Sequence, residues 1–79
     1  MPLRASVQLS NASSEPLKIV IEPWAIEFDL PRRSFCEVVS VGGEPNAHVD
    51  AEADEYGIIV WINTSGGIYE YWQDGELID

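Results

Sequence analysis

Apolar and polar residues alternate one by one along much of this chain, and this period of two limits its fold more than any other feature. Residues 3–9 carry apolar side chains at odd positions and polar ones at even positions. On an extended strand, such alternation places one set of side chains inward and the other in water. The same alternation returns at residues 17–21, 24–30 and 47–54, so the sequence predicts strands.

Turn-forming residues separate these segments. Clusters of Asn, Ser, Pro, Gly and Asp occupy 11–16, 31–34, 42–43, 64–67 and 74–75. The strands between them are expected at 3–9, 17–21, 24–30, 35–41, 47–54, 58–63 and 68–73, with a stub at 76–79. Ala and Glu make a helix the competitor at 47–54, but period two outweighs it. We therefore expect one all-β domain over residues 1–79, a small antiparallel β-sandwich of about six to eight short strands, with a small β-barrel as the alternative.

The alternation slips by one residue at Pro23. Apolar residues stand at odd positions before it, as Ile19 and Ile21 do, and at even positions after it, as Ile26 and Phe28 do. A slip of this kind indicates a bulge or a change of sheet. Two strands are therefore expected here in place of one long strand.

Residues 58–63 and 68–73 flank the short run Thr64-Ser65-Gly66-Gly67, which predicts a tight hairpin with Trp61 opposite Glu70. One face of that hairpin would carry Ile58, Val60, Ile62, Tyr69 and Tyr71. The other face would carry Ile59, Trp61, Asn63, Ile68, Glu70 and Trp72. Both faces are largely apolar, so the second is either covered by a loop or is a candidate interaction surface.

Charge and size restrict the partners. The 79 residues include 14 Asp and Glu against 4 Lys and Arg, a formal charge of −10, which repels nucleic acid and anionic membranes. A chain this short buries a modest core, so association with itself or with a protein partner is expected. Cys36 is the only cysteine, which fits a reducing, cytoplasmic setting, and neither a signal peptide nor a membrane span is expected.

An acidic row invites a metal hypothesis. Potential ligands alternate along one predicted strand at His48, Asp50, Glu52 and Asp54. Residues two apart on a strand lie roughly 7 Å from each other, too far for the whole row to share one coordination shell. A solvated acidic face is therefore expected, with no metal and no cofactor, although adventitious binding of calcium stays open.

No residues form a convincing catalytic set, and we expect a protein that is not an enzyme. Cys36 and His48 lack a third group and an oxyanion donor, and Cys36 on a Val-rich strand is typical of a buried apolar residue. Paired carboxylates for glycoside hydrolysis would have to flank a cleft that a chain of this size seldom forms. The candidates for such pairs are Glu22, Glu27, Asp29 and Glu37.

The run Ile21-Glu22-Pro23-Trp24, followed by Leu30-Pro31 and a Val-rich strand, resembles a pattern in small uncharacterised bacterial single-domain β proteins. The runs 58–61 and 73–77 are similar to that pattern too. The resemblance implies a bacterial origin and a β-sandwich, and it brings no assigned activity.

Three functions follow as hypotheses. The first is a non-enzymatic interaction domain that associates with itself, as a homodimer, or with a protein partner through the aromatic hairpin. The second is an acidic mimic or inhibitor that occupies the groove of a basic partner. The third is a carbohydrate-binding module that uses Trp and Tyr platforms beside carboxylates and Asn63.

Overall fold

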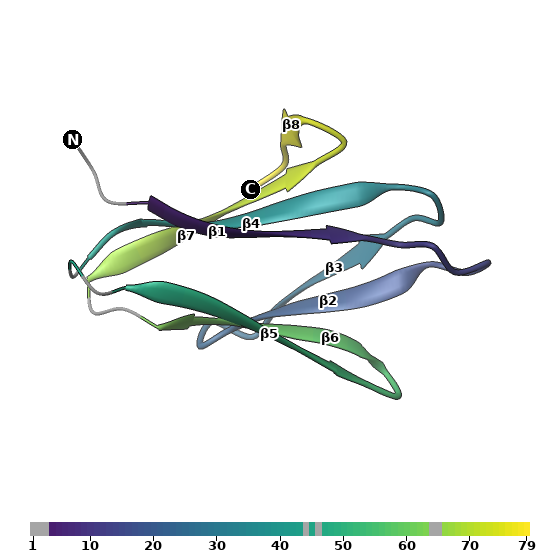
Figure 1. Cartoon of the computed structure of the whole chain (residues 1–79), viewed down its shortest axis with the longest axis horizontal. Coiled ribbons are helices and arrows are strands. Elements are labelled where there is room, and N and C mark those ends of the chain that lie inside the picture. The colour runs from purple at the N-terminus through teal and green to yellow at the C-terminus, as the bar shows by residue number, and fades with distance from the viewer. Residues whose placement is uncertain (1–3, 44, 46, 64–65) are drawn as a thin grey trace.

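The chain folds into two four-stranded sheets packed face to face (Figure 1). The computed structural model describes residues 4–43, 45, 47–63 and 66–79. None of these residues forms a helix, so no helix able to span a bilayer occurs among them. The strands are β1 (Arg4–Ser10), β2 (Leu17–Glu22), β3 (Ile26–Leu30), β4 (Phe35–Gly42), β5 (His48–Asp54), β6 (Gly57–Asn63), β7 (Gly67–Gln73) and β8 (Glu76–Leu77). The prediction of a small all-β sandwich is confirmed.

Strands far apart in the sequence lie side by side in each sheet. Sheet A has the order β1-β4-β7-β8, and sheet B has the order β3-β2-β6-β5. The pairs are antiparallel except β2 with β6, which run parallel. In Figure 1 sheet A forms the upper layer and sheet B the lower one.

The predicted hairpin between residues 58–63 and 68–73 is wrong. β6 pairs with β2 and β5, whereas β7 pairs with β4 and β8, so the chain passes from one sheet to the other between them. Thr64 and Ser65, part of the predicted turn, lie outside the described residues. The local turn signal was outweighed because two strands with apolar inner faces bury more surface across a core than edge to edge.

The inner faces of β6 and β7 nevertheless meet in one core, as the alternation predicts. Buried side chains come from both sheets and comprise Ile19, Ile21, Leu30, Cys36, Val38, Val60, Ile62 and Tyr71. Phe28 on β3 stacks on Tyr71 of β7 with ring centroids 3.8 Å apart and planes 4° apart. This aromatic contact joins the two sheets on the side of the sandwich where β3 and β8 are the edge strands.

At Pro23 the structure contains two strands, as expected, but they stay in one sheet. β2 and β3 pair with each other, with Ile21 opposite Ile26, so the slip marks a tight turn and the expectation of a bulge or a change of sheet is wrong. The turn contains a cis peptide bond between Glu22 and Pro23, and Ala25 has a positive φ of 58°. Because β3 begins only at Ile26, Trp24 lies in this turn. This residue is 39% exposed.

Gly57 makes the parallel pairing of β2 and β6 possible. It lies opposite Lys18, has φ +148°, and a Cβ placed on it would overlap the carbonyl oxygen of Lys18. Only glycine lets the two backbones approach this closely.

Candidate functional site: the outer face of sheet B

The six residues predicted as one interaction surface lie on opposite sides of the molecule. Ile59, Trp61 and Asn63 of β6 point outward from sheet B, because Val60 and Ile62 between them are buried. Ile68, Glu70 and Trp72 of β7 point outward from sheet A, because Tyr71 points into the core. The structure therefore brings together two groups of three, and the sandwich separates the groups.

Internal contacts engage most of the group on sheet A. Glu70 Oε1 accepts hydrogen bonds from Arg4 Nη2 at 2.8 Å and from Trp72 Nε1 at 3.0 Å. These bonds, the one from Trp72 foremost, lower the pKa of the Glu70 carboxyl despite some opposing desolvation. Val39, which lies opposite Glu70 on β4, is only 3% exposed. Of the three residues, Ile68 is the one left widely exposed, at 61%.

The group on sheet B lies in a different environment, which we call the acidic face and define as the outer face of sheet B. An apolar stripe of Val20, Ile59 and Trp61 runs along its two central strands, because Val20 is opposite Ile59 in the parallel register. Carboxylates flank the stripe on both sides: Glu22, Glu27 and Asp29 from β2 and β3, and Asp50, Glu52 and Asp54 from β5. Lys18 also lies on this face and pairs with Glu27 at 2.9 Å.

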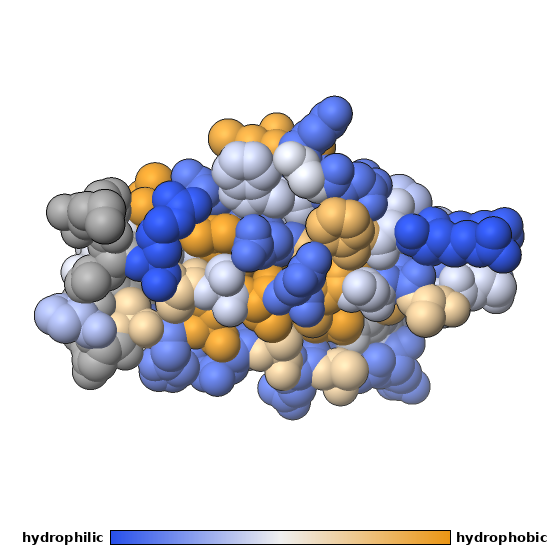
Figure 2. Space-filling model, turned by 45° about the horizontal axis from the view of Figure 1, so that its top comes forward, coloured by the Kyte–Doolittle hydropathy of each residue, from blue (hydrophilic) through white to orange (hydrophobic). Residues whose placement is uncertain are grey.

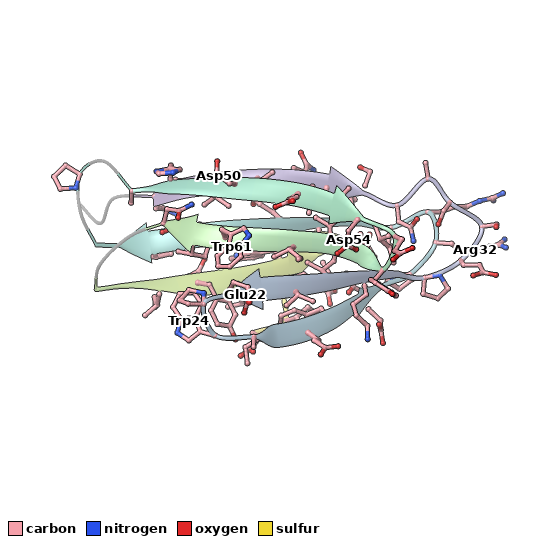
Figure 3. All side chains as sticks on the ribbon, turned by 90° about the horizontal axis from the view of Figure 1, so that it is seen from below. Glu22, Trp24, Arg32, Asp50, Asp54 and Trp61 are labelled. Carbon is pink, nitrogen blue, oxygen red and sulfur yellow. The ribbon has the colours of Figure 1, made fainter. Side chains whose placement is uncertain are left out.

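Trp61 lies between two of these carboxylates. It is 40% exposed, and its neighbours across the sheet are Glu22 on β2 and Asp50 on β5. Figure 3 shows the three side chains in a row across the strands. Strands in a sheet lie about 4.8 Å apart, which puts the two carboxylates on the order of 10 Å from each other with the indole between them.

Asp50 is held in place by its neighbours. Its Oδ2 accepts a hydrogen bond from Asn63 Nδ2 at 2.8 Å and lies 3.2 Å from His48 Nε2. These three residues share the outer side of the β5–β6 pair. The carboxylate on the β5 side of Trp61 is therefore held in position by its own neighbours.

A shallow hollow of about 100 Å³ extends the apolar stripe toward one end of the face. Lys18, Val20, Ile58 and Ile59 line it together with Asp54, Tyr56 and Gly57. Asp54 Oδ1 accepts hydrogen bonds from the backbone N–H groups of Tyr56 and Gly57, at 2.7 and 2.9 Å, and so fixes the turn at the rim of the hollow.

The acidic row of β5 lies along this face as expected, with its side chains exposed. Among the described residues, no three His, Cys, Asp or Glu side chains are grouped closely enough to hold a metal ion. Glu22, Glu27 and Asp29 lie on the same face, whereas Glu37 lies opposite Trp72 on the outer side of sheet A. The four carboxylates considered as pairs are therefore spread over two faces.

Cys36 lies in the core, fully buried, while His48 is exposed on β5. Desolvation raises the pKa of the Cys36 thiol. The hydroxyl of Tyr71 is buried beside this thiol, and no nitrogen or oxygen among the described residues accepts its hydrogen bond. Desolvation, together with the thiol, raises the pKa of Tyr71 as well, so both groups are protonated in the folded protein at neutral pH.

This buried pair predicts a loss of stability in alkali. The unfolded chain releases the Cys36 proton near pH 9.0 and the Tyr71 proton near pH 10.0, whereas the raised pKa values make the folded protein release each proton only at a higher pH. The free energy of unfolding is therefore unaffected by these groups below about pH 8 and falls above it, by about 1.4 kcal/mol per pH unit for each group once that group ionises in the unfolded chain.

Tyr71→Phe should unfold in urea at pH 7 with a midpoint at or above that of the wild type, because it removes a buried hydroxyl without a nitrogen or oxygen partner. Between pH 10 and 11.5 it should lose stability more slowly. Tyr56→Phe is the control, because Tyr56 is 78% exposed. Equal slopes for wild type and Tyr71→Phe would contradict the assignment.

Comparison of the chain with family models, curated proteins and solved structures gives no match. The signals for the acidic face were present in the sequence as Trp61 and the alternating acids of β5. The contribution of Glu22 and Val20 was missed, because it depends on the parallel pairing of β2 with β6.

Proposed function

We propose that this domain is a non-enzymatic binding module that holds a basic, arginine-bearing segment of a partner protein on the acidic face. The observation that carries the proposal is the exposed Trp61 between Glu22 and Asp50. A guanidinium group stacks favourably on an indole, and carboxylates on both sides accept its N–H groups. The proposal joins the first two sequence hypotheses, an interaction domain and an acidic binder of basic partners.

The rest of the face suits the same occupant. Val20, Ile59 and the hollow beside Gly57 offer apolar surface for the aliphatic part of an Arg side chain or for a neighbouring apolar residue. The outer carboxylates and the overall charge of −10 attract a basic segment from a distance and speed its association. A reducing cytoplasm fits the single buried Cys36, and we place the interaction there.

Self-association through the predicted hairpin surface is less well supported. The two halves of that surface lie on opposite sides of the sandwich, and Glu70 and Trp72 are bonded within sheet A. The acidic face of one copy would also repel that of another.

The proposal predicts saturable binding of a short arginine peptide. Titrating tetra-arginine amide into the protein and following the indole N–H signal of Trp61 by NMR should give a binding curve that weakens on raising the salt concentration without vanishing at 0.15 M. Tetra-lysine amide should bind more weakly, because an ammonium group lacks the planar face that stacks on an indole.

Four variants, one of them a control, separate stacking from bulk charge. Trp61→Leu keeps an apolar side chain but lacks the π face, and should weaken binding about tenfold, while Trp61→Phe should stay within about threefold of the wild type. Glu22→Gln with Asp50→Asn should also weaken binding about tenfold. The charge-matched control, Glu37→Gln with Glu76→Gln, changes carboxylates of sheet A and should have an effect of about twofold or less. Equal losses in both double variants would mean unspecific attraction and overturn the proposal.

A further inference from the structure

Two loops meet at one end of the sandwich and border an open hollow of about 200 Å³. Residues 11–16 connect β1 to β2, and residues 31–34 connect β3 to β4. Ala12, Ser13 and Ser14 of the first loop line the hollow together with Arg32 and Arg33 of the second. Figure 3 labels Arg32 at this end, and Figure 2 shows strongly hydrophilic side chains projecting there.

The hollow concentrates positive charge in an acidic chain. Of the four Lys and Arg residues, Arg4 pairs with Glu70 and Lys18 pairs with Glu27. Arg32 and Arg33 form no ion pair with any residue that the structure describes. Half of the basic residues of the chain therefore line one hollow, and among the residues that the structure describes no carboxylate lines it with them.

The two loops are fixed to each other by Asn11. Its side-chain Nδ2 donates to Glu15 O at 2.8 Å and to Leu30 O at 3.0 Å, which ties the first loop to the start of the second. Its backbone N–H donates to Ser34 O, and its backbone oxygen accepts from Arg33 N, both at 2.9 Å. Asn11 is only 3% exposed, so the relative position of the loops is set before any ligand arrives.

The backbone conformation of the second loop also places the two arginines at the hollow. Arg33 has φ +62°, a conformation that is unfavourable for a residue with a Cβ and that persists where surrounding contacts impose it. Here the contact is the bond from Arg33 N to Asn11 O. The turn thus carries two adjacent arginines at the rim of the hollow without using their guanidinium groups in the fold.

We propose that this hollow binds a single phosphate group, as in a phosphate monoester, through the guanidinium groups of Arg32 and Arg33 with help from the Ser14 hydroxyl. Guanidinium groups recognise phosphate by paired, charge-assisted hydrogen bonds. A tetrahedral phosphate offers oxygens in several directions to donors from two loops, whereas a carboxylate offers only two oxygens in one plane. The volume is sufficient for the group with several water molecules.

The negative charge of the whole chain does not prevent this binding. At physiological ionic strength the Debye length is about 8 Å, and the molecule is 38 Å long, so carboxylates at the far end of the sandwich are screened from the hollow. A long polyanion would still meet the acidic surface beyond it. The site therefore fits one phosphate group and not a nucleic-acid backbone, and it does not depend on the function proposed for the acidic face.

The test is an NMR titration with inorganic phosphate, and with sodium acetate and sodium chloride at matched ionic strength and pH. The amide signals of Ser13, Ser14, Arg32 and Arg33 should shift saturably with phosphate, with half-saturation at about 1–10 mM. Acetate should require at least about fivefold more for the same shifts, and chloride should give only small, linear changes.

Variants assign the effect to the two arginines. Arg32→Gln and Arg33→Gln should each raise the half-saturation concentration about fivefold to tenfold, and the double variant should abolish saturation. Arg4→Gln, which removes the same charge from sheet A, is the matched control and should leave phosphate binding within about twofold. Equal responses to phosphate, acetate and chloride, or undiminished binding in the double variant, would overturn the proposal.

Discussion

Gly57→Ala should lower the free energy of unfolding by about 4 kcal/mol, the largest effect of any single substitution proposed for this protein. Two penalties add at this position. A residue with a Cβ at φ +148° is strained by roughly 1–3 kcal/mol, and the new Cβ would overlap the carbonyl oxygen of Lys18. The overlap can be relieved only by separating β6 from β2, which disrupts the parallel pairing at the centre of sheet B.

The measurement is urea or thermal unfolding followed by circular dichroism. The melting temperature should fall by roughly 20 °C, since each kcal/mol shifts it by about 4–8 °C in a domain of this size. Gly75→Ala is the matched control, because Gly75 also has a positive φ, +86°, but a Cβ there meets nothing within 4 Å. The control should cost about 1 kcal/mol, and similar losses in both variants would show that the close approach to Lys18 is unimportant.

Asn11→Ala should lower the free energy of unfolding by about 3 kcal/mol. The Asn11 amide group donates to two backbone oxygens, those of Glu15 and Leu30, and its Oδ1 accepts from the backbone N–H and the hydroxyl of Ser13. Alanine removes all of these bonds and leaves the carbonyl of the fully buried Leu30 without this donor. Each buried polar group deprived of its partner costs about 1–3 kcal/mol.

Asn11→Asp distinguishes the loss of donors from the loss of packing. It keeps the size and one oxygen of Asn11 but turns a second oxygen toward the carbonyls of Glu15 and Leu30. At pH 7 it should be at least as unstable as Asn11→Ala, and it should regain stability as the pH falls toward 4, because a protonated carboxyl can donate once more. Ser13→Ala should cost about 1 kcal/mol or less. An Asn11→Asp variant as stable as the wild type at pH 7 would contradict the role given to the amide.

The strands of this fold could be predicted from the sequence, because alternation is a local property. The observed β2 and β4 begin at the residues expected, Leu17 and Phe35, and the inward side chains of β6 and β7 were assigned correctly. Pairing could not be predicted in the same way. Thr64–Gly67 has the composition of a hairpin turn, yet β6 joins β2, because the burial of two apolar faces across the core outweighs a local turn preference.

The residues of the candidate site could be predicted from the sequence where they depend on local patterns, but not where they depend on strand pairing. Trp61 and the acidic row were recognised because exposed aromatic and charged residues are visible in composition and spacing. Glu22 reaches the neighbourhood of Trp61 only through the parallel register. Likewise, Asn11 read as a turn former, and its bonds to Leu30 and Ser34 depend on two loops that the sequence separates.

Several strands that are neighbours in the sequence lie in different sheets. This arrangement determines when each sheet can form during synthesis. Once β2 and β3 have emerged from the ribosome they can form their hairpin, but β2 has no partner on its other side until β6 follows. Sheet A likewise waits for β7 to cover the free side of β4. Neither layer closes before β6 and β7 have been made, so this domain should fold cooperatively in a late step that is slow for its size, and fragments that end before β7 should not hold the native structure.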